Sequence, residues 1–243
     1  MSHIFVFCLY GVYLMKKIIS LILLLSCIFG MCLYGHALTK EQMDKFTVHC
    51  DAYLGQSDSL VIHSTLNFPL HVDILLYKPT KNLPYWKMIT MGASDFRMPI
   101  NGYYPFGNQY GDRNEYIIFI DKSEDLSDYN TAVAYARHLL QVAHYPQLDN
   151  SFLTFGHSIE WETYDGDEIA GAYIELPMIM EDVGFAFFEL DPDYKIVILQ
   201  PVFLTQSEIQ NLLEVGSQEF DNYLYPNNGR PHFLCELHRS DLF

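Results

Sequence analysis

The chain has 243 residues, of which 50% are hydrophobic and 15% aromatic, and its 30 acidic residues outnumber 14 basic ones for a formal net charge of −16. This composition supplies a large core, so the fold should need neither disulfides nor a metal, and extensive disorder is excluded. A surface this acidic repels phosphate backbones, which argues against nucleic-acid binding. It suits a basic protein partner, although solubility alone would also explain it.

The N-terminus is predicted to be an export signal. Lys16 and Lys17 precede an apolar run over residues 18–33, and small residues follow at Gly35 and Ala37. This order is typical of a signal peptide that is cleaved after Ala37. The leader contributes two bases and no acids, so the mature chain would carry 30 acids against 12 bases, a net charge of −18.

Two alternatives to a cleaved signal remain. Residues 24–27 partly resemble a lipoprotein box with Cys27 as the lipid-bearing residue, and residues 18–34 approach the length of a membrane anchor. Residues 1–14 contain no Lys or Arg, so Met15 is the expected start of translation. All three interpretations export the domain to the periplasm or the envelope.

Two cysteines remain after the leader, Cys50 and Cys235. In an oxidising compartment they could form one bridge across nearly the whole domain. Two buried free thiols are the alternative.

The first half of the mature chain predicts one helix and several strands. Thr39 and Gln42 form a capping box ahead of a helix over 40–54, which ends at Gly55. Strands are expected at 59–66, 70–77, 86–91 and 115–121, with a long Pro-, Gly- and Asn-rich loop at 99–111.

The second half predicts two more helices separated by strands. Asp128 caps a helix over 129–144 that Pro146 stops, with Val133, Ala136, Leu140 and Ala143 on its inner face. Strands are expected near 152–160, 172–180, 184–190 and 195–203, with a turn at 191–193. Thr205 and Glu208 form a second capping box, and the helix that follows turns inward Ile209, Leu212, Leu213 and Phe220.

This order of elements predicts an α/β (α+β) fold, a mixed and mainly antiparallel sheet flanked by helices. We divide the chain into a leader at 1–37, a single domain at 38–225 and a C-terminal tail at 226–243.

Several segments resemble the suppressor of fused family. His71–Leu75 is similar to a V-D-I strand of that family, and Pro84–Asp95 to an aromatic run that ends in T-M-G-x-S. Phe155–Ile159, Ile174–Pro177 and Leu199–Glu208 match later segments in the same order. The resemblance covers roughly residues 60–220.

The resemblance implies an adaptor domain without catalysis or cofactor. The family's animal protein sequesters a transcription factor through a short peptide, and its bacterial branch is thought to include immunity proteins that neutralise toxins. We therefore predict a non-enzymatic binding protein whose partner is a protein, in its most specific form a basic toxin. The alternatives are an envelope adaptor without a toxin partner, a structural lipoprotein and a hydrolase.

An aromatic pair, an adjacent acid and base, and a cluster of acids are candidates for the partner surface. Aromatic residues are good anchors when exposed, and charged residues steer association, although the core is the default position for Tyr85 and Trp86 and a turn is the default role for Asp95. The candidates are Tyr85, Trp86, Asp95, Arg97, Glu160, Glu162 and Asp165.

No catalytic or metal site is predicted. His157 has no nucleophile arranged with it, because Ser158 would point to the opposite face of a strand. His232, Cys235 and His238 have zinc-ligand chemistry but lack an evident fourth ligand. The acidic turns at 165–168 and 191–193 lack the pattern of a calcium loop, and no glycine-rich phosphate loop is present.

Overall fold

The structure is a computed structural model that describes residues 38–63, 70–107, 110–163, 167–224 and 234–238. The predicted leader lies outside the described residues, as do Asp165 and most of the predicted tail. The chain divides into two compact units at His36/Ala37, and only the second, Ala37–Phe243, is described below. Within the described residues, no helix is both long and apolar enough to cross a membrane.

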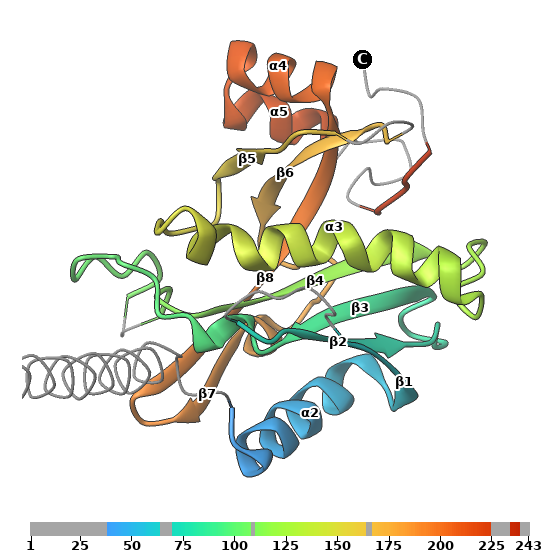
Figure 1. The fold of residues 1–243 in the computed structure, drawn as a ribbon, viewed down its shortest axis with the longest axis vertical. Helices are drawn as coiled ribbons and strands as arrows, with labels where there is room; N and C mark the ends of the chain where they lie inside the picture. The colour runs from blue at the N-terminus through green and yellow to red at the C-terminus, as the bar shows by residue number, and fades with distance from the viewer. Residues whose placement is uncertain (1–37, 64–69, 108–109, 164–166, 225–233, 239–243) are drawn as a thin grey trace, which may run out of the picture. The chain divides into compact units, whose positions relative to one another are not determined.

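One eight-stranded sheet organises the domain, as predicted (Figure 1). Its strands are β1 (Ser57–His63), β2 (Asp73–Tyr77), β3 (Tyr85–Met91), β4 (Asn114–Asp121), β5 (Ser158–Glu160), β6 (Ile169–Glu175), β7 (Phe187–Asp191) and β8 (Tyr194–Thr205). They lie in the order β1-β2-β3-β4-β8-β6-β5, with β7 also paired to β8. Only the β4–β8 pair is parallel among the named strand pairs, so the sheet is mixed and mainly antiparallel.

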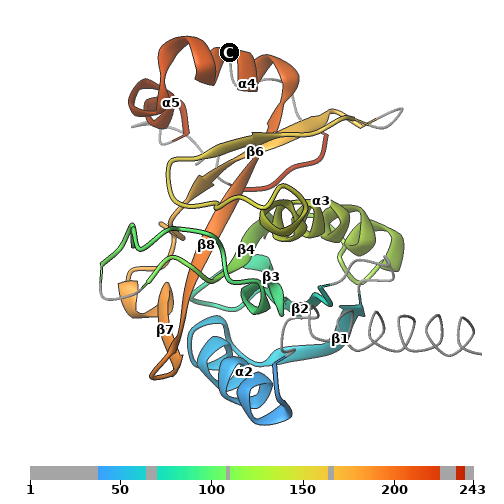
Figure 2. The ribbon, with the colours of Figure 1, turned by 60° about the vertical axis from the view of Figure 1, so that its left-hand side comes forward.

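Helices cover both faces of the sheet (Figures 1 and 2). α3 (Tyr129–Leu148) packs on one face, while α2 (Lys40–Leu54), α4 (Gln206–Val215) and α5 (Ser217–Leu224) pack against the other. Successive residues of β4 alternate between these two cores, Tyr116 and Ile118 facing α3 and Ile117 and Phe119 facing away from it. Burial on both faces explains why this strand is apolar throughout.

Local sequence signals set the helix starts as predicted. The Thr39–Gln42 and Thr205–Glu208 capping boxes are both formed, and Asp128 caps α3 through the Thr131 N–H. At the other end of α2, the buried Lys87 ammonium donates to the Leu54 carbonyl at 3.2 Å and satisfies part of the last turn.

Three details differ from the sequence prediction. α3 continues through Pro146 to Leu148, because a proline in the last turn costs one hydrogen bond while apolar contacts hold the helix. Gly216 divides the last predicted helix, so Phe220 lies in α5. Leu213, predicted to face inward, is 70% exposed, because the apolar stripe of α4 consists of Ile209 and Leu212.

The strand lengths also differ. Only Ser158–Glu160 of the predicted strand at 152–160 pairs, and β6 begins at Ile169 and ends at Glu175, earlier than predicted. Pro177 lies just beyond β6 and cannot donate to a ladder.

The two cysteines lie on opposite faces of the sheet. Cys50 is buried in the core under α2, and Cys235 in the core under α3. Both are free thiols, so the alternative of two buried thiols is the one in the structure, and the bridge is not formed. The Cys235 N–H donates to the Phe119 carbonyl at 2.8 Å, which places this part of the predicted tail beside β4.

Candidate functional site

The T-M-G-A-S segment folds around a buried carboxylate. Glu115 accepts hydrogen bonds from the Thr90 hydroxyl at 2.6 Å, the Ser94 hydroxyl at 2.7 Å and the Gly92 N–H at 2.9 Å. Burial raises the pKa of Glu115, and these hydrogen bonds oppose the rise. Gly92 has φ +112°, and a Cβ there would collide with the His71 carbonyl. The motif is therefore structural. Thr90, Gly92, Ser94 and Glu115 form a joint that holds β3 to β4 and packs against the segment that leads into β2.

Asp95 takes part in the same joint. Its carboxylate accepts from the Tyr194 hydroxyl and from the Leu38 N–H, each at 2.9 Å, and Arg113 lies over the Tyr194 ring at 4.2 Å. Arg97 is exposed and pairs with Asp112 at 2.7 Å. Asp95 therefore holds the start of α2 against β8, and we leave it out of the partner surface.

The predicted aromatic anchors lie at the other end of β3. Trp86 is buried and its indole N–H donates to the Glu124 carbonyl at 3.0 Å, while Tyr85 is half-buried beside the α2 core. Trp86 therefore belongs to the core, and Tyr85 packs beside the α2 core with part of its side chain exposed.

Of the remaining predicted residues, Glu160 ends β5, the last strand at one end of the sheet, and Glu162 follows it two residues later. β5 pairs with β6. At one end of the paired segment the Ile174 N–H donates to the His157 carbonyl, and at the other end the Trp161 N–H donates to the Ala170 carbonyl. Since backbone bonds alternate along an antiparallel strand, Ser158 and Glu160 direct their N–H and C=O groups away from β6. This edge can accept another strand.

An open cleft of about 610 Å³ lies at the end of β5. Its lining residues are Glu160, Trp161, Glu162, Thr163 and Gln206. Glu160 accepts a hydrogen bond from the Gln206 amide at 2.9 Å, which joins β5 to the first turn of α4. Both glutamates are exposed, and the described lining contains no Lys or Arg. The cleft is therefore acidic.

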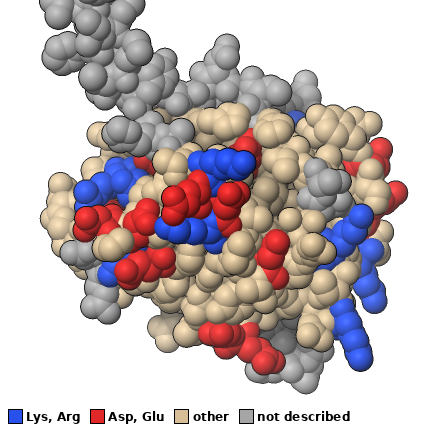
Figure 3. All heavy atoms as spheres, turned by 90° about the horizontal axis from the view of Figure 1, so that it is seen from below, with Lys and Arg blue, Asp and Glu red and all other residues tan. Residues whose placement is uncertain are grey.

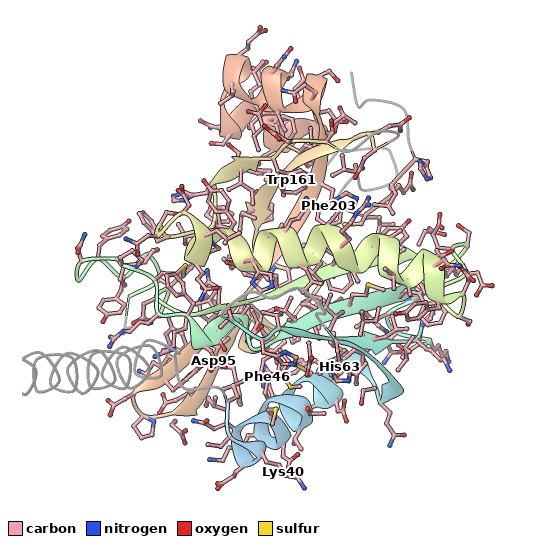
Figure 4. All side chains as sticks on the ribbon, viewed as in Figure 1. Lys40, Phe46, His63, Asp95, Trp161 and Phe203 are labelled. Carbon is pink, nitrogen blue, oxygen red and sulfur yellow. The ribbon has the colours of Figure 1, made fainter. Side chains whose placement is uncertain are left out.

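Trp161 forms a fixed wall of this cleft. Its indole N–H donates to the Ile169 carbonyl at 3.2 Å, and its ring stacks on His138 and lies edge-on to Phe203 (Figure 4). Burial lowers the pKa of His138, although Asp167 opposes the shift, so burial disfavours a positive charge beneath the cleft. A half-buried, hydrogen-bonded indole beside open polar groups is a good anchor for a protein partner.

Sequence reasoning identified the two glutamates of this cleft but missed Trp161 and Gln206. An aromatic residue between two glutamates was the available signal for Trp161. Gln206 could not be linked to Glu160 without the β6–β8 pairing that brings α4 beside β5.

Comparison with known proteins establishes the family. Residues 69–239 match the model of the suppressor of fused protein family. The chain belongs to the suppressor of fused family. The match confirms the resemblance noted from the motifs, and it extends into the predicted tail as far as residue 239. No curated protein sequence matches the chain.

Solved structures of suppressor of fused proteins have the same fold. A putative homologue from Neisseria gonorrhoeae FA 1090 is 12% identical with a TM-score of 0.57, over 84% of this chain and 98% of the homologue. A chain of the Sufu–Fu complex is 13% identical with a TM-score of 0.56, over 83% of this chain and 92% of its own length. Suppressor of fused proteins are regulatory binding proteins, which is consistent with a non-enzymatic, protein-interacting domain here.

Proposed function

We propose that this chain is an exported suppressor of fused domain that captures a basic protein partner at the β5 cleft, and that the partner is a toxin which the domain neutralises. The observation that carries the proposal is the outer edge of β5, with which no strand of the described residues pairs, beside Glu160, Trp161 and Glu162. An extended segment of the partner would pair with Ser158 and Glu160, since an exposed edge strand is a common site of strand addition. Its basic side chains would lie against the two glutamates.

The charge of the domain supports a basic partner. Removal of the leader leaves a net charge of −18, a field that steers a cationic protein toward the surface. The face that carries α2 has a different character, because acidic and basic side chains lie intermixed on it (Figure 3). Lys45 there pairs with both Glu41 and Asp191 at 3.3 Å. The acidic β5 cleft is thus a better site for a cationic partner than the α2 face.

Binding without catalysis also agrees with the environment of His157. Its ring packs against Phe152 with 5.0 Å between centroids, and burial lowers its pKa. This packing gives the imidazole a structural role at the start of β5.

The proposal is tested with the product of the gene adjacent to the one that encodes this chain. Co-expression should rescue cells from that product if the chain is an immunity protein. Reversal of charge at Glu160 and Glu162 should abolish rescue and weaken binding. Binding without any toxicity of the partner would favour the envelope adaptor instead, and unimpaired binding by the charge-reversed variant would refute the β5 site.

A further inference from the structure

A second group of polar side chains lies at the opposite edge of the sheet. His63 ends β1 and Asp73 begins β2, and the two residues are direct partners in the β1–β2 register, so their side chains share one face. His71 precedes Asp73 by two residues and also points toward the Asp73 carboxylate. The strand pairing therefore brings together three side chains that the sequence separates.

The ligand atoms of these three side chains lie close enough together to hold one metal ion. The distance to Asp73 Oδ1 is 2.8 Å from His63 Nδ1 and 2.9 Å from His71 Nε2, and the ligand atoms of all three residues lie within 4.8 Å of one another. Around a tetrahedral zinc ion with bonds of 2.0–2.2 Å, ligand atoms stand roughly 3.4 Å apart. Outward shifts of roughly half an ångström would therefore admit an ion of that size.

The backbone of the site is well supported. Asp73 pairs with Met91 on β3, and its side chain is only 14% exposed. The His71 carbonyl lies against Gly92, where any Cβ would collide with it, so the joint around Glu115 fixes the position of His71. Ligands on a rigid backbone pay little ordering cost when an ion binds.

We propose that His63, His71 and Asp73 bind one divalent transition-metal ion of the zinc–copper class. Two imidazoles and one carboxylate select these ions over Ca²⁺ and Mg²⁺, which prefer ligand shells of oxygen alone. The two imidazoles are 65% and 63% exposed, so the ion keeps an open coordination position for water or for a ligand from another molecule. The bound ion clamps β1 to β2 at an edge of the sheet.

The test is calorimetric titration of Zn²⁺ into the untagged protein, in the form that accumulates after expression of the full gene and after treatment with a chelator. We expect one ion per chain. His63→Gln, His71→Gln and Asp73→Asn should each weaken binding at least tenfold. The matched control is His238→Gln, which removes an exposed histidine of the alternative His232–Cys235–His238 set and should bind Zn²⁺ as the native protein does.

Co²⁺ absorption and thermal melts complete the test. Bound Co²⁺ should show visible d–d bands without a thiolate charge-transfer band, because the ligands are nitrogen and oxygen. Zn²⁺ should raise the melting temperature of the native protein but not that of the three variants, whose melting temperatures without metal should match the native value. Equal Zn²⁺ binding by all four variants, its loss in His238→Gln alone, or a thiolate band would overturn the proposal.

Discussion

Ser94 donates two hydrogen bonds to the buried Glu115 carboxylate, one from its hydroxyl at 2.7 Å and one from its backbone N–H at 3.0 Å. Together with Thr90 and Gly92, it surrounds a carboxyl group that the sheet would otherwise bury without partners. The T-M-G-A-S motif thus has a structural role, and the partner surface proposed at β5 lies elsewhere.

Thr90→Val should destabilise the domain by about 2–3 kcal/mol. The Thr90 hydroxyl donates to Glu115 at 2.6 Å and accepts the Tyr116 N–H at 2.8 Å, so valine would remove one donor from the buried Glu115 carboxyl group and leave the buried Tyr116 N–H without this acceptor. Urea denaturation measures the change, with Thr47→Val on α2 as the control. A change of less than about 0.5 kcal/mol would show that the joint contributes little.

Glu175→Gln should flatten the dependence of stability on pH. Burial, with repulsion from Asp221, raises the pKa of Glu175 to about 8, whereas an unfolded glutamate titrates near about 4.3. The folded protein therefore keeps a proton that the unfolded chain releases, so this stability is complete below about pH 4.3 and is lost as the pH rises through about 8.

We expect the variant to gain about 2–4 kcal/mol relative to the native protein between pH 4.5 and pH 8.5. Denaturation at a series of pH values measures this gain, with Glu162→Gln on the exposed rim of the cleft as the control. If the free energy of unfolding changes with pH in the same way for the native protein and for Glu175→Gln, Glu175 is ionised in the fold.

Processing after Ala37 should place a new ammonium group on Asp95. The Leu38 nitrogen already lies 2.9 Å from Asp95 Oδ2 and the Leu38 side chain is buried, so cleavage converts a neutral donor into a charged one. Asp95→Asn should cost the processed protein about 1–2 kcal/mol. N-terminal sequencing should return Leu38; a start at Met15 would contradict cleavage, and one at Cys27 would indicate a lipoprotein.

Cys50 and Cys235 should resist alkylation until the protein unfolds. Both are buried, and burial raises the pKa of the Cys50 thiol, which suppresses the reactive thiolate. Mass spectrometry of the processed protein after iodoacetamide treatment should show no label in buffer and two labels in denaturant. A single disulfide-linked species in non-reducing conditions would contradict the assignment of free thiols.

Local signals made much of the fold predictable. The two capping boxes fixed the starts of α2 and α4, because a cap depends on residues three apart. Such local signals do not predict which distant strands pair with each other. The parallel contact of β4 with β8 and the position of Cys235 beside β4 depend on how the whole sheet assembles.

The same limit applies to the sites. Glu160 and Glu162 were recognisable as neighbouring charges, but their relation to Gln206 depends on the position of α4. His63 and His71 looked unrelated in sequence, and only the register of β1 and β2 brings them to Asp73.

The most direct test of the proposed function is the association rate between this protein and the product of the adjacent gene, measured at low and physiological salt. The Glu160→Lys, Glu162→Lys double variant is compared with Asp44→Lys, Asp193→Lys, which makes the same charge change on α2 and on the β7–β8 turn, away from β5. Reversal at the cleft should slow association about 10- to 100-fold at low salt, and the difference should shrink at physiological salt, where screening shortens to about 8 Å. The control and His157→Ala should bind nearly as the native protein does. Equal slowing by both double variants would contradict the β5 site, and a folded but inactive His157→Ala variant would contradict a binding function.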